Sequence, residues 1–166
     1  MWRFFGLFLF FQLAMFVFEL HPLGQQYMVI PFTEFIAKVS ATLIHLFDPS
    51  VISRGIELWN ADYSFGVSIE AGCNGVEAAI VLFAAMLAFP SSIKAKIIGM
   101  SIGFVAIQAM NLARIITLFY IGQWNQTFFE WAHLYIWQVL IMLDVLVVLL
   151  VWLRFLSPAK ELEDEA

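Results

Sequence analysis

The chain has 166 residues, of which 63% are hydrophobic and 13% are charged, and its formal net charge is −5. A soluble domain is about half apolar and about a quarter charged, so this composition excludes an ordinary soluble protein and indicates a membrane protein. No basic cluster indicates a nucleic-acid partner. Much of the negative charge lies in residues 158–166, which we expect to be the cytoplasmic acidic tail of one membrane-embedded domain covering residues 1–166.

Four segments are long and apolar enough to cross a bilayer as helices, which takes about 20 residues. They are Trp2–Leu20, 75–89, 97–121 and 133–155. The first segment has the composition of a signal peptide, but residues 21–24 offer no small-x-small cleavage site. We therefore predict that it is an uncleaved transmembrane helix.

Basic residues set the orientation of these spans, because short cytoplasmic loops carry an excess of Lys and Arg. One side of the predicted bundle carries five of the eight basic residues: Arg3, Lys94, Lys96, Arg154 and Lys160. That side is predicted to be cytoplasmic, with both chain termini on it. The loops 48–72 and 122–132 then lie on the outer face of the membrane.

The segment 27–47 is long enough to span the membrane, yet it carries Glu34, Lys38 and His45. A fifth crossing would also put one terminus outside and break the charge rule. Its apolar residues recur at helical spacing: Phe32, Phe35, Ile36, Val39, Leu43 and Phe47. We predict an amphipathic helix in the outer interface.

Alternating residues follow this helix and predict a short β-hairpin before the cysteine. Its strands cover residues 56–59 and 63–69, with a turn at 60–62. The hairpin could offer a free strand edge to an extended substrate, or it could simply pack over the outer face.

Cys73 is the only cysteine, which excludes an intramolecular disulfide and a CxxC dithiol. One cysteine and three scattered histidines give no zinc spacing, and we expect no cofactor. Cys73 lies between Gly72 and Gly75 at the start of a predicted span, where a helix N-terminus favours a thiolate. The alternative is a small buried hydrophobe, which is the usual environment of a free cysteine.

Two further polar residues lie at a similar outer depth on the next two spans. Arg114 lies roughly 12 Å below the outer end of its helix, at 1.5 Å per residue, with Asn111 one turn further in. An arginine within a span indicates a functional site, and snorkelling to the interface is the alternative. His133 begins the last span and, taken alone, could be a polar anchor. Together, thiol, imidazole and guanidinium are the groups of a thiol acyl-transfer catalyst.

Two acidic residues are predicted to have partners inside the membrane. Glu77 lies one turn deeper than Cys73 on the same helix face, and we predict an ion pair with Arg114. Asp144 lies near the midplane at the depth of Gln108, where a polar clasp between helices is expected. Recognition of a basic group of a binding partner is the alternative role for Asp144.

Three motifs in consecutive order resemble the exosortase/archaeosortase family, in its compact exosortase H type. They are Glu70-x-x-Cys73-x-Gly75, Asn111-x-x-Arg114 and His133 in the next span. The resemblance covers about residues 70–152. It departs from many exosortases at Asn74, where they have Ser.

The resemblance implies an all-α polytopic protein of the bacterial inner membrane, with its active site on the periplasmic face. It implies a cysteine protease/transpeptidase in which Cys73 is the nucleophile, Arg114 stabilises the oxyanion and His133 is the acid/base. Further contacts are expected from Glu70, Asn74, Glu77 and Asn111. The implied partners are exported proteins that carry a C-terminal motif, a transmembrane segment and a basic tail. The alternatives are a non-catalytic membrane scaffold and a small transporter.

Overall fold

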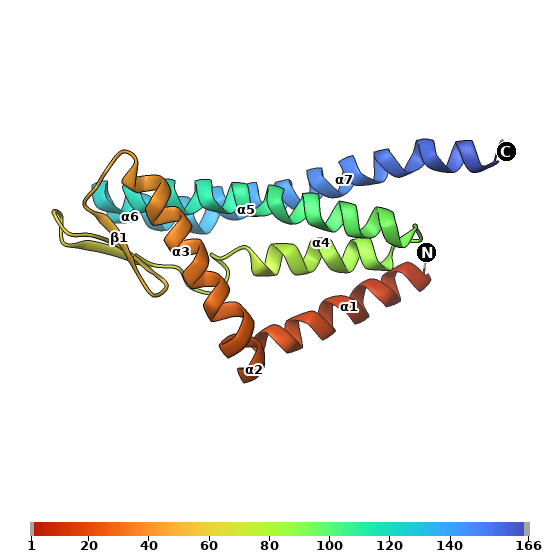
Figure 1. Cartoon of the computed structure of the whole chain (residues 1–166), viewed down its shortest axis with the longest axis horizontal. Helices are drawn as coiled ribbons and strands as arrows, with labels where there is room; N and C mark the ends of the chain where they lie inside the picture. The colour runs from red at the N-terminus through yellow and green to blue at the C-terminus, as the bar shows by residue number, and fades with distance from the viewer. Residues whose placement is uncertain (1, 165–166) are drawn as a thin grey trace.

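The structure is a computed structural model in which residues 2–164 are described. The chain is mainly helical and carries one small sheet (Figure 1). The helices are α1 (Trp2–Leu20), α2 (Pro22–Gly24), η1 (Gln25–Val29), α3 (Ile30–His45), α4 (Val76–Ala88), α5 (Ile93–Trp124), α6 (Gln126–Trp131), η2 (Ala132–Ile136) and α7 (Trp137–Asp164). The helices η1 and η2 are π-helical turns that continue into α3 and α7.

Within the described residues, four helices are long and apolar enough to cross a membrane, which confirms the predicted class. They are Trp2–Leu20, Pro22–His45, Ile93–Trp124 and Gln126–Leu156. The set differs from the predicted one, because α4 has only 13 residues and the segment that ends in α3 meets the length requirement.

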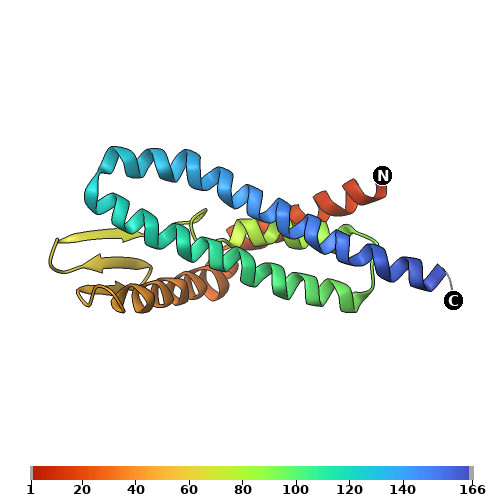
Figure 2. The same cartoon turned by 90° about the horizontal axis from the view of Figure 1, so that it is seen from above.

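The long axis of the molecule separates two regions (Figure 1). Both termini and the α4–α5 connection lie at one end, where α1 and α4 pack beside α5 and α7. The sheet, α3 and α6 lie toward the other end (Figure 2). Helix α3 packs on the sheet and on α5. The interfacial position of segment 27–47 stays a prediction, because Pro22–His45 is also long and apolar enough to cross a membrane.

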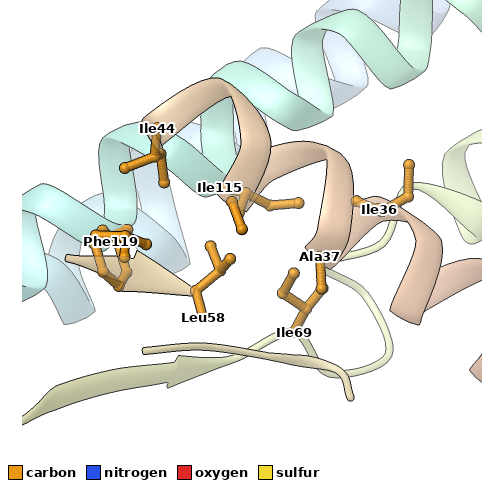
Figure 3. Close-up of a cluster of buried hydrophobic side chains, with 9 residues drawn as sticks. Ile36, Ala37, Ile44, Leu58, Ile69, Ile115 and Phe119 are labelled. Atoms are coloured by element: carbon orange, nitrogen blue, oxygen red, sulfur yellow. The ribbon is translucent and has the colours of Figure 1, made fainter. Parts of the chain in front are cut away.

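The cluster at the sheet end is formed by α3, the strands and α5 (Figure 3). Ile36 and Ile44 of α3 are buried against Leu58 of the sheet and Phe119 of α5. Its buried members are Ile36, Ala37, Ala41, Ile44, Val51, Leu58, Ile69, Ile115 and Phe119. Other apolar residues of α3, such as Phe35, remain exposed, so the helix carries apolar groups on two sides.

The sheet has three antiparallel strands in the order β1–β2–β3, where β1 is Val51–Arg54, β2 is Glu57–Asn60 and β3 is Phe65–Ser68. The predicted hairpin is β2–β3, while β1 was not predicted. The predicted second strand began too early, because Ser64 has φ +49° and lies in the turn. The Asn60 side chain organises that turn by accepting hydrogen bonds from the N–H groups of Asp62 and Tyr63.

A second cluster joins α4, α5 and α7 at the end that holds the termini. Gly99 of α5 allows the Trp152 indole to pack on the helix, where its Nε1–H donates to the Ala95 carbonyl at 3.0 Å. The predicted clasp between Asp144 and Gln108 is absent, because neither polar atom of the Gln108 side chain has a partner within the described residues. The acidic tail is not tested, since its last residues, 165–166, lie outside the described part.

The Gly99 contact gives a stability test. A Cβ at this position would lie 2.2 Å from Trp152 Nε1, so Gly99→Ala must displace the buried indole. Overpacking of this kind costs about 1–3 kcal/mol. Thermal unfolding in detergent should show a lower midpoint for Gly99→Ala. The matched control is Gly6→Ala in α1, where nothing lies within 4 Å of the added Cβ; an equal loss in both variants would contradict the prediction.

Candidate functional site

Cys73 lies in a tight loop between β3 and α4. The loop turns twice through positive φ, at Gly72 (+83°) and Gly75 (+77°), a conformation that glycine adopts at little cost. Its backbone is closed by a hydrogen bond of 2.9 Å from the Cys73 N–H to the Glu70 carbonyl. A Cβ at Gly75 would also crowd two buried side chains, at 2.8 Å from Gln108 Nε2 and 3.3 Å from Asn111 Cγ.

The loop places the thiol against side chains from two other elements. Cys73 Sγ lies 3.0 Å from His133 Nε2, and the Arg114 guanidinium donates to Sγ through Nη2 at 3.6 Å. His133 comes from the π-helical turn η2 and stacks on Phe129, with ring centroids 5.7 Å apart. The structure therefore brings together the three residues singled out in the sequence, although they lie as far as 60 positions apart.

Arg114 is 3% exposed and is held in a defined orientation. Its Nη1 donates to the Gly72 carbonyl at 3.0 Å, which fixes the guanidinium under the loop. Its Nε–H is buried and has no partner among the described residues. A fixed cation whose Nη2 lies beside a thiol is suited to stabilise a developing negative charge.

The electrostatics of the site keep the thiol protonated at rest. Burial raises the pKa of Cys73, the Arg114 guanidinium opposes this rise, and the carboxylates of Glu77 and Glu70 add to it. The expectation that a helix N-terminus would favour the thiolate is therefore wrong. Cys73 precedes the first residue of α4 by three positions, and burial outweighs the favourable groups. A base is needed to remove the proton, and His133 is in contact with it.

The predicted ion pair between Glu77 and Arg114 is not formed, although both residues lie in the described part of the chain. Glu77 instead accepts a hydrogen bond from the Gly72 N–H, while Arg114 donates to the Gly72 carbonyl. The two charged side chains thus hold one glycine from opposite sides. The loop backbone had to be known to find this arrangement, because helical spacing alone gives only similar depths.

Glu19 was missed in the sequence analysis. It lies near the end of α1, is 2% exposed, and its carboxyl group forms a side-chain hydrogen bond with Glu77. Because a carboxylate can only accept, a hydrogen bond between two carboxyl groups requires that one of them carries a proton. The signal was present, since an acidic residue within an apolar span is costly unless it has a partner.

The remaining predicted site residues have different surroundings. Asn74 is buried and anchors the loop: its Nδ2 donates to Thr33 Oγ1 of α3, and its Oδ1 accepts from the Val76 N–H, both at 3.0 Å. Asn111 is fully buried one turn from Arg114, and neither polar atom of its side chain has a partner in the region described. Glu70 is exposed at the rim, where its carboxylate accepts from Ser68 Oγ at 2.7 Å.

A cavity of about 330 Å³ opens directly onto the thiol. One wall is the continuous stretch 65–70, which is β3 and the two residues after it. The opposite wall is mainly apolar and includes Leu118 of α5 and Phe129 of α6. Cys73, Arg114 and His133 also line this cavity, so a molecule bound there would contact all three.

Comparison with known proteins identifies a family whose model covers all residues of the site. The family model for the transmembrane exosortase matches residues 2–152, which include every strand and every helix except the end of α7. No curated protein and no solved structure matches the chain.

Replacing Arg114 tests the electrostatic balance at the thiol. Arg114→Gln keeps a donor for Gly72 but removes the positive charge that lowers the pKa of Cys73. The thiol pKa should rise further, so less thiolate is present at any given pH. Alkylation of the single cysteine by iodoacetamide should then be several-fold slower near neutral pH, with its pH profile moved to higher pH. Arg54→Gln on β1 is the control, and an unmoved profile in Arg114→Gln would contradict the assignment.

Replacing Glu19 tests the buried carboxyl pair. Glu19→Gln retains a donor for the Glu77 carboxylate and should alkylate within about twofold of the wild-type rate, because one hydrogen bond is exchanged for another. Glu19→Leu leaves Glu77 without this partner, so the Gly72 loop loses its support and alkylation should slow several-fold. Glu57→Leu, an exposed position on β2, is the control. Equal rates in Glu19→Leu and Glu19→Gln would show that the pair does not position the loop.

Proposed function

The chain belongs to the transmembrane exosortase family, and from this premise we propose that it is a membrane cysteine transpeptidase. It cleaves the C-terminal sorting signal of exported proteins and transfers them to an acceptor nucleophile. The observation that carries this proposal is the contact of Cys73 Sγ with His133 Nε2 at 3.0 Å, beside the buried guanidinium of Arg114.

The first half-reaction forms a thioester. His133 takes the thiol proton on Nε2 as the Cys73 sulfur attacks the carbonyl carbon of the scissile peptide bond. The carbonyl oxygen becomes an oxyanion, which the Arg114 guanidinium stabilises by its positive charge and by donation from Nη2, the atom that contacts Cys73 Sγ. The intermediate collapses by breaking the C–N bond, and the leaving amine receives the proton from His133.

The second half-reaction releases the enzyme. An acceptor nucleophile gives its proton to His133 and attacks the thioester carbonyl, again through an oxyanion beside Arg114. The C–S bond breaks, the exported protein is joined to the acceptor, and the proton returns from His133 to the sulfur. No group outside the chain is needed for either proton transfer.

The arrangement of the molecule supports the orientation proposed for this reaction. Both termini lie at one end of the molecule, together with the α4–α5 connection and the start of α5, which carries Lys94 and Lys96 (Figure 1). The positive-inside rule assigns that end to the cytoplasm. The Cys73 loop lies toward the sheet, and we propose that it faces the periplasmic side of the bacterial inner membrane.

The main alternative is a scaffold that uses the same fold without chemistry. A scaffold does not require a thiol in contact with an imidazole and a guanidinium. It would also tolerate substitution of Cys73 as well as it tolerates substitution of an exposed residue, so the two functions make opposite predictions.

A cellular comparison tests the proposed function. Wild-type cells should release exported proteins that have lost a C-terminal segment, and Cys73→Ala cells should accumulate the same proteins uncleaved. His133→Ala should slow the cleavage at least about 100-fold, the usual contribution of a general acid/base. Mass spectrometry of the membrane fraction and of the released proteins measures the uncleaved and the cleaved forms. Immunoblots show that each variant accumulates. A hydroxylamine-sensitive adduct on Cys73 identifies the thioester, and unchanged processing in Cys73→Ala favours the scaffold.

A further inference from the structure

The strand next to the thiol has one unpaired edge. In the order β1–β2–β3, β3 hydrogen-bonds β2 on one side only. The register pairs Val67 with Leu58 and Phe65 with Asn60, and the Ile69 N–H donates to the Ile56 carbonyl at 3.0 Å in continuation of that register. Hydrogen-bonded pairs alternate along an antiparallel ladder. The N–H and C=O groups of Phe65, Val67 and Ile69 therefore face β2, and those of Gly66 and Ser68 face away from the sheet.

The other ladder gives the same alternation. The Ala61 N–H donates to the Ser50 carbonyl at 3.2 Å, in register with the pairing of Val51 and Asn60. The backbone N–H and C=O groups of Trp59 and Glu57 therefore face β1, and those of Leu58 and Asn60 face β3. The two ladders use alternate residues of β2, as a regular three-stranded sheet requires. On the opposite edge of the sheet, the same reasoning leaves the N–H of Ser53 facing outward from β1.

The free edge of β3 opens into the cavity that contains the catalytic groups. Residues 65–70 form one wall, and the chain then turns within three residues to Cys73. At about 3.3 Å per residue, the edge from Gly66 to Glu70 extends about 13 Å. Gly66 has no side chain, and Trp59 of β2 covers its face of the sheet. The facing wall presents Ile115, Leu118 and Phe129, which suits neutral side chains of an extended chain.

We propose that the segment of the exported protein that precedes the scissile bond binds as a fourth strand on β3, pairing with the outward N–H and C=O groups of Gly66 and Ser68. This proposal rests on the proposed function and specifies its substrate as an extended backbone, not a helix or a folded domain. Backbone pairing supplies affinity for any sequence, and the apolar wall selects the side chains that alternate toward it. The strand ends at the Cys73 loop, where the next carbonyl meets the thiol.

A pair of proline substitutions tests this strand addition. Ser68→Pro removes an N–H that would face the substrate. The hydrogen bonds between β3 and β2 are kept, because the Ser68 N–H faces away from β2, and proline is tolerated at such an outward position of an edge strand. Ser53→Pro removes the equivalent N–H from the far edge, outside the cavity. Each variant is assayed on an exported protein that accumulates uncleaved in Cys73→Ala cells. Ser68→Pro should lower kcat/KM about tenfold or more, mainly through KM, and Ser53→Pro should resemble wild type.

A peptide series covers the case in which Ser68→Pro fails to fold. Synthetic peptides with the cleaved sequence of that exported protein carry one N-methyl group at successive positions. Strand addition predicts that every second N-methyl group blocks cleavage and that the intervening ones are tolerated. Uniform tolerance or uniform loss overturns the proposal, as does equal activity of Ser68→Pro and Ser53→Pro. If no protein depends on Cys73 for cleavage, the proposed function fails instead, so the two failures are distinct.

Discussion

The site depends on two hydrogen bonds to the backbone of Gly72. Arg114 donates to its carbonyl and Glu77 accepts from its N–H, so one glycine fixes a cation and an anion on opposite sides of a short loop. Burying either charge alone would be costly, and the backbone partner lowers that cost without bringing the charges into direct contact. The separation leaves Nη2 of Arg114 free to donate to Cys73 Sγ. A direct ion pair with Glu77 would have occupied the same guanidinium.

This loop also connects parts of the fold that have little else in common. Through Glu77 and Glu19 it is linked to the first span, through Asn74 and Thr33 to α3, and through Cys73 to η2. Each link crosses between elements far apart in the chain. The glycines with positive φ permit the tight path, and buried polar contacts hold it. The geometry of the thiol therefore depends on the packing of α1, α3 and η2 around the loop, not on α4 alone.

The sequence was sufficient for the class of fold and for the three residues that meet at the thiol. The length of the apolar segments and the order of Cys73, Arg114 and His133 can be recognised in the sequence without any knowledge of packing. The ion pair of Glu77 was predicted wrongly because helical periodicity gives depth but not the course of a loop. Glu19 was missed because a single carboxylate at the end of an apolar run resembles a helix boundary, and only the packing of α1 on α4 supplies its partner. Strand β1 was missed because its two apolar residues, Val51 and Ile52, are followed by the two polar residues Ser53 and Arg54, so apolar and polar residues do not alternate.

The single thiol has a consequence for oxidation of the protein. Peroxide attacks thiolates, and burial keeps Cys73 in the less reactive protonated form. Once a sulfenic acid has formed there, the chain holds no second cysteine that could resolve it as an intramolecular disulfide. Recovery then requires a reductant from outside the chain. The burial that raises the pKa of the Cys73 thiol thus also protects it from oxidation.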